Sequence, residues 1–118
     1  MKIAMVQLNI AWESKQENYK RAEVFIKRAA YEGCNVVVFP EMFNTGFSMN
    51  VSQIAEDEKG EAFSLLSRMA ETYNIHIIAG LPVKLSGEEK GRNIAAIFDR
   101  KGIVIAKYTK IHPFSFLK

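Results

Sequence analysis

The sequence has a single cysteine, Cys34, among 118 residues. One cysteine excludes an intramolecular disulfide framework and a cysteine-based zinc site. No apolar run approaches the roughly 20 residues of a membrane-spanning helix, and the start turns polar by Gln7, too early for the core of a signal peptide. We therefore expect a cytoplasmic protein with no membrane partner.

An excess of charge of one sign is also missing. The 16 Lys and Arg residues against 13 Asp and Glu residues give a net charge of +3, and the signs alternate through residues 15–32. Nucleic-acid binding requires a one-sided basic cluster, so we expect no nucleic-acid partner. Neither a glycine-rich phosphate loop nor a Gly-x-Ser-x-Gly motif is present, which argues against nucleotide-binding and serine-hydrolase folds.

The hydrophobic pattern predicts seven elements in the order β-α-β-α-β-β-β. Strands are expected at 2–9, 36–39, 75–83, 93–98 and 103–108, with a hairpin turn at 99–102. A capping box at 14–17 begins the first helix, Gly33 ends it, and Asn74 ends the second. The buried helix faces are Ala22, Phe25, Ile26 and Ala29, and then Phe63, Leu66, Met69, Ala70 and Tyr73. The chain is therefore expected to be one α/β (α+β) unit, 1–118, a mixed sheet with two helices on one face.

Two helices on one face leave the other face of the sheet without cover. Residues 36–38 and 75–78 are nevertheless apolar at every position except His76, the pattern of strands buried on both sides. We expect a missing second layer, supplied either by further chain or by another subunit, and hence a partial domain that forms a homo-oligomer.

Two charged residues follow predicted strand ends. Glu41 comes directly after Pro40, which stops the ladder of a buried strand because it has no N–H to donate. Lys110 follows the last predicted strand. If both ends lie at one edge of the sheet, a carboxylate and an ammonium converge on one pocket, where α/β proteins place their chemistry. Most Glu–Lys pairs, however, are surface ion pairs of little consequence.

The residues around these two positions resemble a known family. The run Phe39-Pro40-Glu41-Met42-Phe43, then Thr45-Gly46-Phe47, and later residues 108–114 (Tyr-Thr-Lys-Ile-His-Pro-Phe) are similar to two catalytic blocks of the nitrilase, or carbon–nitrogen hydrolase, superfamily. The resemblance covers the whole chain, and the first block is most similar to the ω-amidase-like branch. It implies the N-terminal half of a four-layer α-β-β-α sandwich and hydrolysis of small amides without cofactor or metal.

The resemblance also implies roles for single residues. Glu41 matches the general base and Lys110 the residue that stabilises the oxyanion of the intermediate, in a Glu-Lys-Cys mechanism that passes through a thioester. Phe43, Phe47 and His112 are weaker candidates for contacts with substrate. The nucleophilic cysteine is expected on a later strand that this sequence does not contain.

Cys34 is a poor substitute for that nucleophile. It precedes the strand whose other end leads to Glu41, and four extended residues span roughly 13 Å. A lone cysteine at such a junction is usually a small core residue. His76 lies inside a predicted strand, so we expect it to be a structural histidine and neither a catalytic base nor a metal ligand.

Two functional hypotheses remain open. The chain is part of an amidase and is inactive alone, because it lacks the cysteine. Alternatively, it is a non-catalytic half-domain that associates with itself or a partner through the uncovered sheet face.

Overall fold

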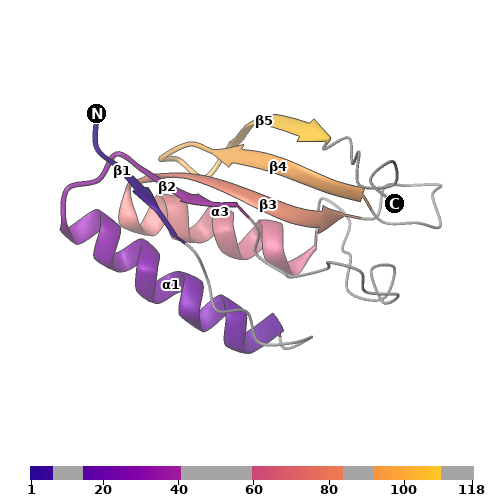
Figure 1. The fold of residues 1–118 in the computed structure, drawn as a ribbon, viewed down its shortest axis with the longest axis horizontal. Coiled ribbons are helices and arrows are strands. Elements are labelled where there is room, and N and C mark those ends of the chain that lie inside the picture. The colour runs from indigo at the N-terminus through magenta and orange to yellow at the C-terminus, as the bar shows by residue number, and fades with distance from the viewer. Residues whose placement is uncertain (7–14, 41–59, 84–91, 110–118) are drawn as a thin grey trace, which may run out of the picture.

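A five-stranded sheet carries helices α1 and α3 on one face (Figure 1). The computed structural model describes residues 1–6, 15–40, 60–83 and 92–109. Its elements are β1 (Ile3–Met5), α1 (Lys15–Tyr31), β2 (Val36–Phe39), α3 (Glu61–Tyr73), β3 (His76–Val83), β4 (Arg92–Phe98) and β5 (Val104–Thr109). The predicted α/β class, element order and mixed sheet are confirmed.

The strand directions bring four carboxyl ends to one edge. The sheet order is β1-β2-β3-β4-β5; β1, β2 and β3 are parallel, while β4 runs antiparallel to both β3 and β5. Strands β1, β2, β3 and β5 therefore all end at the same edge of the sheet, which we call the carboxyl edge.

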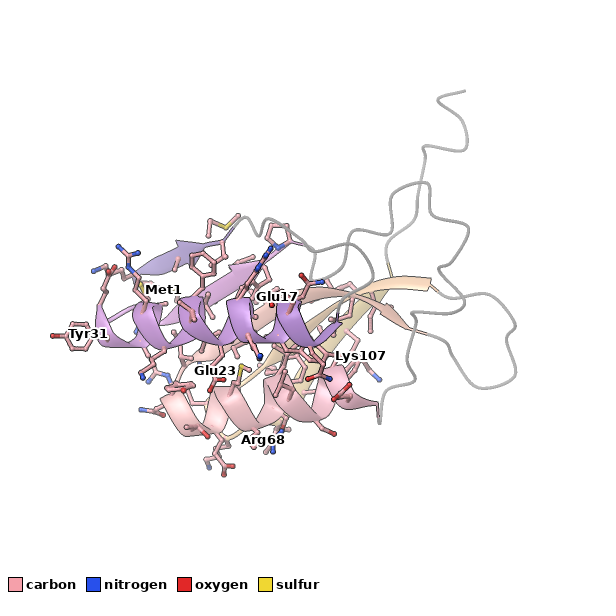
Figure 2. The ribbon with its side chains drawn as sticks, turned by 90° about the horizontal axis from the view of Figure 1, so that it is seen from below. Met1, Glu17, Glu23, Tyr31, Arg68 and Lys107 are labelled. Atoms are coloured by element: carbon pink, nitrogen blue, oxygen red, sulfur yellow. The ribbon has the colours of Figure 1, made fainter. Side chains whose placement is uncertain are left out.

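The helix-covered face holds the apolar core. Val37 of β2 lies in register with Ile77 of β3, and Ile77 with Phe98 of β4; all three are fully buried. Phe98 contacts Phe63 of α3, with ring centroids 5.7 Å apart. Figure 2 shows α1 and α3 side by side beneath this face. The apolar positions predicted for α3 pack here, with Tyr73 half-buried at the end.

Each helix ends in a left-handed residue, as predicted. Gly33 has φ +81°, and the N–H groups of Gly33 and Cys34 donate to the carbonyls of Ala30 and Ala29. Asn74 has φ 54°, and the N–H groups of Asn74 and Ile75 repeat this pattern on α3. Both are Schellman motifs, which satisfy carbonyls that the helix itself leaves free.

The opposite face of the sheet carries apolar side chains with no layer over them among the described residues. It consists of Ile3, Met5, Val36, Val38, His76, Ile78, Ala95, Ile97, Ala106 and Tyr108, which the strand register places together. We call this set the open sheet face. Ile3, Met5 and Tyr108 are 53%, 69% and 61% exposed, whereas Val36 and Val38 are half-buried. The predicted burial of β2 on both sides therefore holds only for its helix side in this chain.

One detail of α1 differs from the sequence predictions: Phe25, expected on the buried stripe, is 37% exposed. The Glu17 carboxylate accepts a hydrogen bond from Arg21 Nε at 3.3 Å. Its predicted capping partner Ser14 lies outside the described residues, so the capping box stays a prediction. No helix among the described residues is long and apolar enough to cross a membrane.

Candidate active site

The carboxyl edge is where the chain leads into both predicted catalytic residues. Strand β2 ends at Phe39, two residues before Glu41, and β5 ends at Thr109, one residue before Lys110. The register links Phe39 through Ala79 and Ala96 to Lys107 in one row across the sheet. Three strand spacings separate the ends of this row, or about 14 Å.

The candidate residues themselves lie outside the described part of the chain. This holds for Glu41 and Lys110 and for the weaker candidates Phe43, Phe47 and His112. The strand directions place the ends of β2 and β5 at one edge, which meets the condition that the sequence left open. The roles of these residues stay predictions.

The first turns of both helices lie close together. Gln16 in the first turn of α1 donates from Nε2 to the Glu61 carboxylate, the first residue of α3, at 2.9 Å. The end of α1 leads into the start of β2, and the end of α3 leads into the start of β3, both at the edge opposite the carboxyl edge. Each helix runs antiparallel to the strand that follows it, so each helix begins near the carboxyl edge. The positive ends of two helix dipoles therefore lie at the edge that leads to Glu41.

Cys34 lies at the opposite end of β2. Its N–H closes the Schellman motif of α1, and its side chain is half-buried against the core. The predicted helix–strand junction is confirmed, and the length of β2 separates this thiol from the carboxyl edge.

His76 is the first residue of β3, at the edge of the sheet opposite the carboxyl edge, and is half-buried on the open sheet face. No cluster of three metal-binding side chains occurs in the described ranges.

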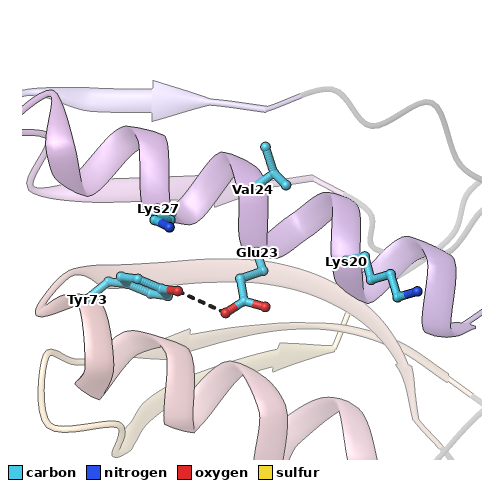
Figure 3. A pocket seen from close by; sticks show the side chains of 5 residues that line it. All are labelled: Lys20, Glu23, Val24, Lys27 and Tyr73. Carbon is cyan, nitrogen blue, oxygen red and sulfur yellow. Dashed lines mark hydrogen bonds between the residues drawn. The ribbon is translucent and has the colours of Figure 1, made fainter.

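A shallow hollow of about 400 Å³ lies on the helix layer, between α1 and α3 (Figure 3). Lys20, Glu23, Val24, Lys27 and Tyr73 line it, and the Tyr73 hydroxyl donates to the Glu23 carboxylate at 2.9 Å. This bond to Glu23 and some desolvation raise the pKa of Tyr73. The hollow holds none of the predicted site residues, and its Tyr73–Glu23 bond joins the two helices.

One polar residue that the sequence reasoning missed is Asn18, which is only 1% exposed. It stands four residues before Ala22 and eight before Ile26, both fully buried, so it occupies the buried stripe of α1. That spacing was the available signal: an amide at a stripe position is unusual, since buried polar groups need partners.

The family model described as carbon–nitrogen hydrolase matches residues 2–118, nearly the whole chain. The chain belongs to the carbon–nitrogen hydrolase family. It is 31% identical to 2-oxoglutaramate amidase of Bacillus subtilis (strain 168), over 98% of this chain and 44% of that protein. It is 35% identical to the human omega-amidase NIT2, over 96% of this chain and 41% of that protein. The chain thus spans less than half the length of these relatives.

Solved structures agree with the family membership. The amidase from Nesterenkonia sp. superposes with a TM-score of 0.79 at 26% identity, over 95% of this chain and 43% of that one. Other structures of that amidase show acrylamide added at the active-site cysteine and a complex with butyramide. The predicted family and fold, with the sheet and helices corresponding to the N-terminal part of such amidases, are confirmed.

Proposed function

We propose that this chain contributes the base and the cation of an amidase active site that hydrolyses small ω-amides. The observation that carries the proposal is the common edge at which β2 and β5 end, one or two residues before Lys110 and Glu41, in a chain of the carbon–nitrogen hydrolase family. A separation of about 14 Å across the sheet between Phe39 of β2 and Lys107 of β5 is one that a small substrate and two long side chains can fill together.

The proposed reaction needs a cysteine from the part of the domain that this sequence does not include. Glu41 takes the thiol proton, and the thiolate attacks the amide carbon. The ammonium of Lys110 stabilises the oxyanion that develops in the transition state. The C–N bond then breaks, and the proton on Glu41 leaves with ammonia. Glu41 next removes a proton from water, which attacks the thioester and releases the acid and the thiol.

The choice of an ω-amide rests on similarity alone. One relative is named omega-amidase NIT2, and another is named 2-oxoglutaramate amidase. On this proposal the 118-residue chain has no turnover by itself, because it brings two of the three reacting groups.

The test is ammonia release from short ω-amides, measured on the longest natural polypeptide that contains this sequence and on the 118-residue chain. Glu41→Gln keeps the size of the side chain and removes the base, and Lys110→Ala removes the cation; each is expected to lower kcat at least about a hundredfold. Lys107→Ala, at an exposed position of β5, is the control and should keep the parent rate. Unchanged rates in both site variants would refute the assignment.

The open sheet face favours a second candidate function, association of two copies of this chain. The face is apolar, and His76 is its only titratable side chain apart from the Tyr108 phenol, so two copies can approach without charge repulsion. Exposed apolar patches of this kind mark interaction surfaces. We expect the 118-residue chain to form a dimer that buries this face.

Sedimentation of matched variants tests the association. Met5→Lys adds a charge to the open sheet face at a position 69% exposed, and Val24→Lys adds one to the outer side of α1 at a position 63% exposed. Met5→Lys should raise the dissociation constant at least about tenfold, the equivalent of 1.4 kcal/mol, while Val24→Lys leaves it unchanged. A monomeric parent chain at high concentration would exclude this candidate.

A further inference from the structure

One side chain of the open sheet face, that of His76, gains a charge in mild acid. The strand register aligns His76 with Val36 on this face, while Ile77, the next residue, is fully buried on the helix-covered face. An imidazole takes up a proton between about pH 8 and pH 5, whereas phenols such as that of Tyr108 stay neutral there. Acid therefore puts one positive charge per chain on a surface that is otherwise uncharged.

His76 lies beside the apolar side chains that a partner would bury. It stands on β3, the middle strand of the five, and the register aligns Ile3 of β1, Val36 of β2 and His76 in one row across the sheet. Ile3 is 53% exposed, whereas Val36 and His76 are half-buried. A second copy that covers this row removes water from the imidazole together with the apolar side chains.

The charged neighbours of His76 lie at one end of this row, in the turn after β4. Asp99 follows the last residue of β4, the strand next to β3. The hydrogen bond from the Ile103 N–H is the largest cause that lowers the pKa of Asp99, and the charges of His76 and then Lys101 lower it by less. On the β2 side, the His76 N–H donates to the carbonyl of Asn35 at 3.1 Å, and neither group is charged. Asp99 is thus a partial counter-charge, held in the turn by two backbone N–H groups.

We propose, on the basis of the self-association proposed above, that protonation of His76 dissociates the dimer formed through the open sheet face. A charge that leaves water for an apolar surface loses its hydration, and a two-fold dimer takes in two imidazolium groups, one from each copy. Formation of the dimer therefore releases protons. Association is strongest where the imidazole is neutral, and it weakens as the pH falls through the range in which the separate chains bind a proton.

Sedimentation equilibrium of the 118-residue chain at pH 7.0 and pH 5.5, at one ionic strength, tests the proposal. The dissociation constant of the dimer should rise at least about tenfold at the lower pH, because two imidazoles titrate per dimer. Carboxylates and lysines largely keep their charges between these two values. Urea unfolding at pH 5.5 verifies that each chain is still folded under the conditions of the measurement.

Three variants assign the effect to one residue. His76→Gln is neutral at both pH values, so its dissociation constant should differ by less than about twofold between them. His76→Lys is charged at both, so at pH 7.0 it should already dissociate at least about tenfold more readily than the parent. His112→Gln is the control, because it removes the only other histidine of the sequence, and it should keep the response of the parent.

The outcomes separate this role of His76 from the association itself. A parent dimer with the same dissociation constant at pH 7.0 and pH 5.5 would refute the role of His76 and keep the association. A pH response that persists in His76→Gln, or that disappears in His112→Gln, would also show that His76 is not the responsible group. A parent chain that stays monomeric at both pH values would refute the proposed association and this role together, while the amidase proposal would be unaffected.

Discussion

The Ser67 hydroxyl of α3 donates a 2.6 Å hydrogen bond to the carbonyl of Gly102, in the turn between β4 and β5. The helix backbone approaches this turn so closely that a Cβ on Gly102 would lie 2.5 Å from the Ser67 carbonyl oxygen. Gly102 also has φ +82°, a conformation that glycine adopts without strain. The turn and the helix are therefore fitted to a residue that has no side chain.

Gly102→Ala should destabilise the chain more than Gly33→Ala does. Both glycines are left-handed, at φ +82° and +81°, so each variant should lose about 1–2 kcal/mol from backbone strain. Gly33 has nothing within 4 Å of an added Cβ, whereas Gly102 meets the helix, which adds about 1–3 kcal/mol of overpacking. Urea unfolding of the two variants measures the difference, and equal losses would show that the turn can move away from α3.

The Asp99 carboxylate makes the same turn sensitive to acid. The N–H of Ile103, and then that of Lys101, donates to Asp99 Oδ1, each at 2.9 Å. The Ile103 bond, with a smaller contribution from Lys101, lowers the pKa of Asp99 below its ordinary value of 3.8, although partial desolvation opposes the shift. A carboxylate with a lowered folded-state pKa stabilises the fold above its ordinary pKa, and this contribution disappears as the pH falls through the folded-state value.

Asp99→Asn should therefore weaken the acid dependence of stability. Asparagine keeps an oxygen that can accept both N–H groups but does not titrate in this range. Between pH 7 and pH 3, the urea midpoint of the parent chain should fall further than that of the variant. Parallel pH curves for the two proteins would mean that Asp99 does not contribute to acid unfolding.

Asn74 closes α3 in a left-handed conformation at φ 54°. Asn74→Gly should leave stability unchanged within a few tenths of a kcal/mol, because glycine is the commonest residue at this place in a Schellman motif. Asn74→Ala should lose about 1 kcal/mol, because alanine adopts this conformation at a cost. Thermal unfolding of the pair distinguishes the two, and a stable alanine variant would show that α3 can end in another way.

The local sequence pattern was enough to predict every described strand and helix. Residue types that favour or end each element stand at the right places: Gly33 and Asn74 end the helices, and the turn at Asp99 joins β4 to β5. These signals act over a few residues and depend little on the rest of the molecule. That is why the order of the elements and the mixed sheet followed from the sequence, whereas the common edge for the strands leading to Glu41 and Lys110 was known only from the structure.

What the sequence pattern missed depends on tertiary neighbours. Phe25 is as apolar as Ile26, but at about 100° per residue it lies on the flank of α1 opposite Gln16 and Glu23. Those two residues bond to α3, so the second helix covers their flank and leaves Phe25 partly exposed. Asn18 was missed for the converse reason, because its polar side chain predicts exposure, whereas its burial depends on residues that pack against it in the folded chain.

Phe98 is the residue whose loss should weaken the helix–sheet interface most. It is fully buried on β4 and packs against Phe63 at a ring separation of 5.7 Å. Phe98→Ala removes a large side chain from an interior in which α3 cannot close the gap, because the Ser67–Gly102 bond holds that helix to the neighbouring turn. The expected loss is about 3–5 kcal/mol of unfolding free energy.

Ile105→Ala, at a position 56% exposed on β5, is the control and should change stability by less than about 0.5 kcal/mol. A loss below about 2 kcal/mol for Phe98→Ala, read from urea unfolding, would mean that α3 does shift to fill the cavity.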